Sequence, residues 1–167
     1  MIRVLLADDH VMFREAITAI LEKDGDISVV ATASDGREAL RTAVEAKPRI
    51  AILDVFMPSL NGMDATRQMS SIKSGPRVIL ISGHHEPRFI VEGLKAGARA
   101  YIRKENAAGE LVRAVREVAK GGVYLSSDAT EIVARAIRTP PPAHNRMLST
   151  REREVLQLVA EGRSTKE

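Results

Sequence analysis

Three aspartates in this sequence each follow a short apolar run. Asp8 and Asp9 follow Val4–Ala7, and Asp54 follows Ile50–Leu53. Carboxylates that come together repel one another and raise each other's pKa values, so a cation is needed beside them. Oxygen ligands in this number suit Mg²⁺, which binds one or two carboxylates and completes its shell with water and phosphate oxygens. The three aspartates therefore predict a Mg²⁺ site.

Two further polar residues end apolar runs farther along the chain. Ser82 follows Val78–Ile81, and Lys104 closes a weaker run that begins at Ala100. An ammonium group and a hydroxyl beside a carboxylate–metal cluster can bind the oxygens of a phosphoryl group. A carboxylate can carry that group covalently. Asp54 is expected to be the acceptor, because it lies between the metal ligands and the side that holds Ser82 and Lys104.

These residues need a scaffold that brings the ends of the runs together. The continuous apolar runs are Val4–Ala7, Ile27–Ala33, Ile50–Leu53, Val78–Ile81 and Ala100–Ile102. Continuous apolarity indicates strands buried on both faces, as in a parallel sheet. The intervening stretches have helical periods, and in residues 35–46 the pattern places Ala39, Leu40 and Val44 inward. Five strands, each followed by a helix, predict a doubly wound α/β domain that binds ligands at the carboxyl ends of its strands.

The character of the chain changes after residue 122. Residues 126–138 predict one further short helix, and Pro140–Pro142 predict an extended spacer. A Ser-x-x-Glu capping box at Ser149–Glu152 then begins another helix. A lone helix of about a dozen residues cannot bury its apolar face, so it is expected to open a further domain. The predicted division is residues 1–122, a linker at 123–147, and an all-α segment at 148–167.

Composition excludes several classes of protein. The 167 residues are 44% hydrophobic and 28% charged, which is typical of a globular chain. The absence of cysteine excludes disulfides, Cys-ligated zinc, iron–sulfur clusters and thiol catalysis. No apolar run approaches the roughly 20 residues that span a bilayer, and the N-terminus does not resemble a signal peptide. We therefore expect a cytoplasmic protein without a membrane partner, and the net charge of +3 indicates no particular ligand.

Residues 1–122 resemble the receiver domain of bacterial two-component response regulators. The residues that carry the resemblance are Asp8, Asp9, Asp54, Met57, Pro58, Gly62, Ser82, Tyr101 and Lys104. Residues 148–167 resemble the start of a LuxR-type helix-turn-helix. The whole chain resembles a response regulator of the NarL/FixJ class, with its output domain incomplete. The resemblance implies a flavodoxin-like (βα)5 fold with the strand order 2-1-3-4-5.

The resemblance also implies how the acidic residues divide their work. Asp54 would accept a phosphoryl group from a histidine of a partner kinase, in a reaction that requires Mg²⁺. Asp9, Asp54 and the backbone carbonyl of Phe56 would bind the metal directly, and Asp8 would act mainly through water. The chain would then be a phosphoacceptor regulator of transcription, and it would catalyse only its own phosphorylation and dephosphorylation.

A second implied group reports the phosphorylation. Lys104 would hold a phosphoryl oxygen, while Ser82 and Tyr101 would form a switch pair. When Ser82 turns toward the phosphoryl group, the Tyr101 ring would swing inward and change the surface of the fourth helix, fifth strand and fifth helix. We expect this change to promote a homodimer, either through that surface or through one that includes the first helix.

The resemblance to a DNA-binding domain stops short of the part that reads DNA. Thr165 stands where the family more often has Asn. A helix-turn-helix reads bases through its second helix, which the sequence does not contain. We therefore expect DNA binding through a full-length output domain, and no specific DNA-binding residues in these 167.

Two other functions stay open. A phosphohydrolase of the haloacid-dehalogenase kind also uses an aspartate after a parallel strand, but its second carboxylate would fall at Phe56. A receiver that binds proteins without being phosphorylated is not excluded. A metal site at His84 and His85 is disfavoured, because adjacent histidines rarely chelate one ion, and a solvated pair is expected.

Overall fold

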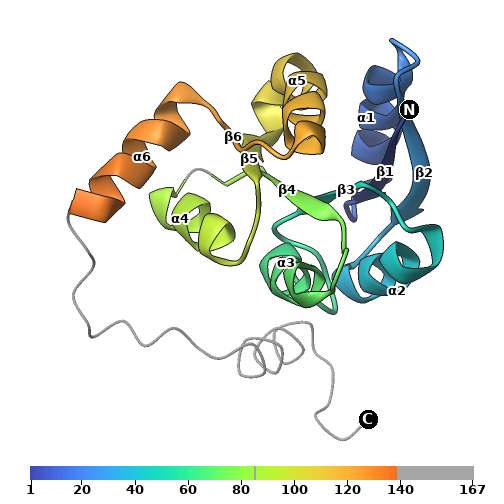
Figure 1. The fold of residues 1–167 in the computed structure, drawn as a ribbon, viewed down its shortest axis with the longest axis horizontal. Helices are drawn as coiled ribbons and strands as arrows, with labels where there is room; N and C mark the ends of the chain where they lie inside the picture. Colours follow the sequence, from blue (N-terminus) through green and yellow to red (C-terminus); the bar gives the residue numbers. More distant parts are fainter. Residues whose placement is uncertain (85, 139–167) are drawn as a thin grey trace, which may run out of the picture.

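The computed structural model describes residues 1–84 and 86–138 (Figure 1). Within them, one parallel sheet has the strand order β2-β1-β3-β4-β5-β6. Its strands are β1 Ile2–Ala7, β2 Ile27–Ala33, β3 Ile50–Asp54, β4 Arg77–Ser82, β5 Ala100–Arg103 and β6 Tyr124–Leu125. The helices are α1 Val11–Glu22, α2 Gly36–Ala46, α3 Gly62–Ser71, α4 Pro87–Lys95, α5 Ala107–Lys120 and α6 Ser127–Arg138, with a 3₁₀ turn η1 at Lys104–Asn106.

Helices cover both faces of the sheet. Helices α1 and α5 pack on one face, and α2, α3 and α4 pack on the other (Figure 1). Successive strand residues point to opposite faces, so Leu5 joins the core under α2 and α3 while Val4 and Leu6 join the core under α1 and α5. Both cores require apolar residues, which explains why the strands are continuously apolar. The predicted flavodoxin-like class and the order 2-1-3-4-5 are confirmed.

Two details differ from the sequence-based expectations. The prediction that Val44 faces inward is wrong, because its exposed fraction is 62% and Ala43 is buried in its place. The face of α2 that packs on the sheet therefore carries the small residues Ala39 and Ala43. The sheet also has a sixth strand, β6, which pairs parallel to β5 through Ala100 with Tyr124 and Tyr101 with Leu125.

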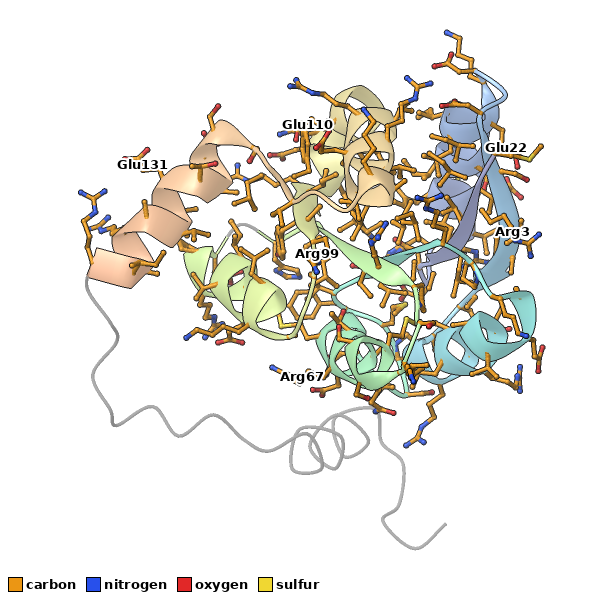
Figure 2. All side chains as sticks on the ribbon, viewed as in Figure 1. Arg3, Glu22, Arg67, Arg99, Glu110 and Glu131 are labelled. Atoms are coloured by element: carbon orange, nitrogen blue, oxygen red, sulfur yellow. The ribbon has the colours of Figure 1, made fainter. Side chains whose placement is uncertain are left out.

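Residues 123–138 pack against the part of the chain that precedes them. Helix α6 lies beside α4, with Ile132 and Val133 against the core under α4 and Ala129 buried (Figure 1). On its outer side α6 carries charged residues such as Glu131, labelled in Figure 2. The predicted domain limits at 122 and 147 stay predictions. The proline spacer, the capping box and segment 148–167 lie outside the described residues, and no helix within those residues is long and apolar enough to cross a membrane.

The turn between β3 and α3 holds the end of β3 against the start of the helix. Asn61 caps α3 by accepting a hydrogen bond from the backbone of Asp64. The Gly62 N–H donates to the carbonyl of Val55 at 2.9 Å. A Cβ atom at Gly62 would lie 2.0 Å from the carbonyl oxygen of Asp54, so this close approach excludes any side chain. Gly62 therefore fixes the backbone that carries Asp54.

Gly62→Ala is expected to lower the free energy of unfolding by about 1–3 kcal/mol, because the backbone must move to relieve the overlap. Chemical denaturation measures the change. The matched control is Gly109→Ala in α5, where an added Cβ meets no atom within 4 Å. The control is expected to be neutral or stabilised by up to about 1 kcal/mol, since Ala favours helix more than Gly does. Equal effects at the two positions would show that the contact with Asp54 does not limit stability.

Candidate functional site

The residues predicted to do chemistry meet at one edge of the sheet. Asp54 and Ser82 are the last residues of β3 and β4, while Asp8 and Lys104 directly follow β1 and β5. Strands β1, β3, β4 and β5 are neighbours in that order. The carboxyl ends of these strands therefore bring all four residues to one edge of the sheet, where the Asp54 and Lys104 side chains line a cleft.

Lys104 bridges two buried carboxylates. Its Nζ lies 2.6 Å from Oδ2 of Asp54 and 2.6 Å from Oδ2 of Asp8. Asp8 is fully buried and Asp54 is 3% exposed, so water does little to screen their charges. The Lys104 ammonium also lies 4.7 Å from the centre of the Phe13 ring, a cation–π arrangement. The single positive charge of Lys104 thus interacts with the negative charges of both Asp8 and Asp54.

The protonation equilibria reflect this shortage of positive charge. Burial raises the pKa of the Asp54 carboxyl above its ordinary value; the Lys104 hydrogen bond lowers it in part, and the charge of Asp8 raises it further. Burial alone would lower the pKa of Lys104, but its hydrogen bonds to Asp54 and Asp8 outweigh that effect and raise it. Lys104 therefore stays charged at neutral pH, while the ionised form of Asp54 is held at a cost in free energy.

Two residues at the start of α1 complete the acidic side of the crevice. Asp9 is exposed, and its Oδ1 lies 2.8 Å from Nδ1 of His10. The same imidazole nitrogen lies 3.2 Å from Oδ1 of Asp8, which also accepts the backbone N–H of His10 at 2.8 Å. Arg14 donates a hydrogen bond to the carbonyl of Asp8. Sequence reasoning missed His10, although its position next to the aspartate pair was a usable signal.

The acidic cluster fits a divalent cation. One oxygen each from Asp8, Asp9 and Asp54, together with a ring nitrogen of His10, all lie within 4.8 Å of one another. Among the described residues the buried Oδ2 of Asp8 accepts no hydrogen bond of normal geometry, although the Lys104 Nζ lies 2.6 Å away. Carboxylate oxygens are hard ligands of the kind that Mg²⁺ binds. The part assigned to the Phe56 carbonyl stays a prediction.

Ser82 and Tyr101 lie next to this cluster in the interior. The Ser82 hydroxyl is fully buried and accepts the backbone N–H of His84 at 3.0 Å. Tyr101 is 2% exposed, and its hydroxyl has no hydrogen-bond partner of normal geometry among the described residues. Burial raises the pKa of Tyr101, and the adjacent Ser82 hydroxyl lowers it in part. The Tyr101 ring faces α4, because a Cβ on Gly93 would lie 3.4 Å from its Cδ2.

Aromatic side chains form one wall of the crevice. The ring centres of Phe56 and His84 lie 4.3 Å apart, and those of Phe56 and Phe89 lie 5.2 Å apart. A cleft of about 450 Å³ opens between this wall and α1, and Asp54, Lys104 and His10 line it. The prediction that His84 is exposed agrees with the structure, while its stacking on Phe56 was not foreseen; His85 lies outside the described residues. The Asp54 carboxylate is therefore reached through an open, partly aromatic cleft.

Comparisons with known proteins show the family to which the chain belongs. A family model described as "Response regulator receiver domain" matches residues 4–116. The chain belongs to the response regulator family. The response regulator is 37% identical to the transcriptional regulatory protein LiaR of Bacillus subtilis over 169 residues, which cover 100% of this chain and 80% of LiaR. It is 34% identical to the transcriptional regulatory protein UhpA of Escherichia coli over 167 residues, again covering 100% of this chain and 80% of the relative.

Solved structures place this response regulator in the same class. A LuxR-family two-component response regulator from Aurantimonas superposes with a TM-score of 0.76 at 30% identity, covering 82% of this chain and 98% of that one. The signal receiver domain of the putative response regulator NarL from Mycobacterium tuberculosis gives 0.69 at 37% identity, covering 72% and 97%. The response regulator is thus of the NarL/FixJ class, and its named relatives are transcriptional regulators.

Asp54→Asn is expected to raise the midpoint temperature of the metal-free protein at neutral pH. The folded-state pKa of Asp54 is raised, so ionising this carboxyl costs folding free energy at every pH above that pKa. The advantage of the variant should shrink as the pH falls through the folded pKa toward the ordinary value of 3.8, where the parent carboxyl becomes protonated in both states. Thermal unfolding in a chelator across this pH range measures the effect. A variant that is less stable than the parent at neutral pH would contradict the expectation.

Proposed function

We propose that this response regulator accepts a phosphoryl group on Asp54 from a phosphohistidine of a partner kinase, in a Mg²⁺-dependent reaction, and passes its state to a DNA-binding output domain. The observation that carries the proposal is the Lys104 ammonium, 2.6 Å from oxygens of both Asp54 and Asp8 at the base of an open cleft. A cation held there can pair with a phosphoryl oxygen as readily as with the carboxylates.

The transfer needs little covalent chemistry from the protein. A carboxylate oxygen of Asp54 attacks phosphorus, the P–N bond of the phosphohistidine breaks as the P–O bond forms, and the released imidazole takes a proton from water. The backbone N–H of Phe56 donates to Oδ1 of Asp54 at 3.2 Å and so holds the nucleophile in place. As the phosphoryl group is transferred, the Lys104 ammonium would exchange its contact with the Asp54 carboxylate for one with a phosphoryl oxygen.

The metal site belongs to the same proposal. Asp9, Asp54 and the carbonyl of Phe56 would hold Mg²⁺ directly, with Asp8 acting through water. The ion would supply positive charge at the transferring phosphoryl oxygens. The protein's own part is to keep Asp8 buried and oriented, which the backbone N–H of His10 does at 2.8 Å.

The signal would leave the site through Tyr101. Ser82 would turn its buried hydroxyl to a phosphoryl oxygen. The Tyr101 ring is already buried in this structure, at 2% exposed, so the expectation that it swings in from outside is corrected: it would shift within the interior, into the space that Ser82 vacates beneath α4. Helix α6 packs on α4, so a movement of α4 reaches the segment that leads toward the output domain. The surface of α4, β5 and α5 would then favour a homodimer. DNA contact is assigned to the complete output domain.

The alternatives receive less support. A haloacid-dehalogenase-like hydrolase needs a second carboxylate at position 56, and the Phe56 ring there packs on His84. A binding module without phosphorylation has no need for an ammonium shared by two buried carboxylates. The chain is therefore proposed to be a phosphoacceptor regulator. It would catalyse only its own phosphorylation and dephosphorylation.

Incubation with acetyl phosphate and Mg²⁺ is expected to add one phosphoryl group per chain, seen by intact mass spectrometry. Asp54→Asn should abolish the gain, because the nucleophilic carboxylate is lost. Asp128→Asn, which alters an aspartate whose side chain is 73% exposed on α6, is the matched control and should leave the gain unchanged. Continued release of phosphate from simple phosphate esters would favour a hydrolase, and an unmodified parent would favour a binding module.

Phosphorylation is expected to increase the sedimentation coefficient of the chain, since the shifted Tyr101 exposes a dimer-forming surface. Sedimentation velocity of the protein before and after acetyl phosphate measures this. Ser82→Ala should still gain a phosphoryl group but sediment as the unmodified protein, because the hydroxyl that couples the site to Tyr101 is gone. An unchanged coefficient for the fully phosphorylated parent would count against dimerisation.

A further inference from the structure

The His10 imidazole faces the acidic crevice and does not cap a helix. His10 is the residue before α1, in extended backbone geometry, and its side chain makes no capping hydrogen bond to that helix. The ring turns instead to the acidic crevice, with Nδ1 at 2.8 Å from Asp9 and 3.2 Å from Asp8. The side chain is 69% exposed, so the contact is open to ions and water from the cleft.

The imidazole lies at the centre of the cluster that fits a cation. Its ligand atom and those of Asp8, Asp9 and Asp54 lie within 4.8 Å of one another. Ligands of a single ion with bonds of about 2.0–2.2 Å can stand about 4 Å apart, so small side-chain rotations close this set around one ion. Two of the three carboxylates, those of Asp8 and Asp54, share the Lys104 ammonium. Asp9 contacts only the His10 ring among the ion pairs of the described residues, which leaves room in the charge balance for a divalent cation.

The donor set is mixed, and this decides which ions it prefers. Carboxylate, carbonyl and water oxygens suit Mg²⁺, whereas an imidazole nitrogen adds affinity for Zn²⁺ and other late first-row ions. We propose that His10 is a ligand that lets the acidic site bind Zn²⁺ with Asp9 and Asp54, in competition with Mg²⁺. The inference rests on the metal site of the proposed function and extends it from the presence of a cation to the choice between cations.

Competition of this kind has a consequence for Asp54. In the proposed reaction Asp54 holds Mg²⁺ and also attacks phosphorus, whereas Zn²⁺ would be held by the His10 imidazole as well. The choice between the two ions would therefore change the ligands that surround Asp54 when it accepts the phosphoryl group. The alternative is that Nδ1 only donates a hydrogen bond and orients the aspartates, in which case the two ions would be affected alike.

The test compares the two metals on the same metal-free chain. Isothermal titration with Zn²⁺ and separately with Mg²⁺ is made on the parent and on His10→Asn. Asparagine keeps a side-chain N–H to donate to the carboxylates and is a good residue before a helix, but it lacks the imidazole ligand. We expect Zn²⁺ affinity to fall by about 10- to 100-fold, the range seen when metal-site residues are replaced. Mg²⁺ affinity should change little. His84→Asn, which alters the other described imidazole lining the cleft, is the matched control and should leave Zn²⁺ affinity unchanged.

A second measurement reads the imidazole directly. Nitrogen NMR of the histidine rings should show a metal-bound nitrogen of His10 when Zn²⁺ is added, and no such change with Mg²⁺. Equal Zn²⁺ affinities in parent and His10→Asn, or an unaffected His10 ring, would overturn the proposal while leaving the Mg²⁺ site intact. If the parent binds neither ion, the metal site of the proposed function fails as well. Unfolding curves in chelator check that the variant folds, and His10→Gln replaces it if it does not.

Discussion

Two buried carboxylates that share one ammonium group are the constraint on which this response regulator depends. Asp8 and Asp54 lie at the ends of neighbouring strands, and Lys104 reaches both from the end of a third. Burial strengthens every charge–charge interaction there, so each carboxylate is held strongly but at a cost. The crevice is therefore poised for additional positive charge or for a change in its negative charge. Metal binding and acceptance of a phosphoryl group are the two events that would supply these.

The rest of the fold serves to keep that crevice in place. Both faces of the sheet are covered, which removes water from the strands and fixes the ends that carry the aspartates. The α4–α6 contact then adds a layer on the side of Tyr101, whose hydroxyl has no hydrogen-bond partner of normal geometry among the described residues. A buried hydroxyl without a hydrogen bond costs about 1–3 kcal/mol, so a position in which Tyr101 gains a partner would be favoured.

Sequence reasoning found the strand ends because they depend on a simple rule. Continuous apolar runs indicate a parallel sheet, and the carboxyl ends of parallel strands share one edge. The sequence could therefore predict that Asp54, Ser82 and Lys104 lie near one another. It did not find β6, because two residues, Tyr124 and Leu125, carry no periodic signal. It also misplaced Val44, since a helix face shifted by one residue still looks amphipathic. The ion pairs of Lys104 and the orientation of His10 depend on side-chain rotamers, which spacing in sequence does not determine.

The close approach of Gly62 to the Asp54 carbonyl has a mechanical consequence. Backbone atoms that touch without an intervening side chain cannot slide past one another, so the end of β3 and the first turn of α3 form a rigid joint. A small displacement at the end of β3 would therefore carry the first turn of α3 with it.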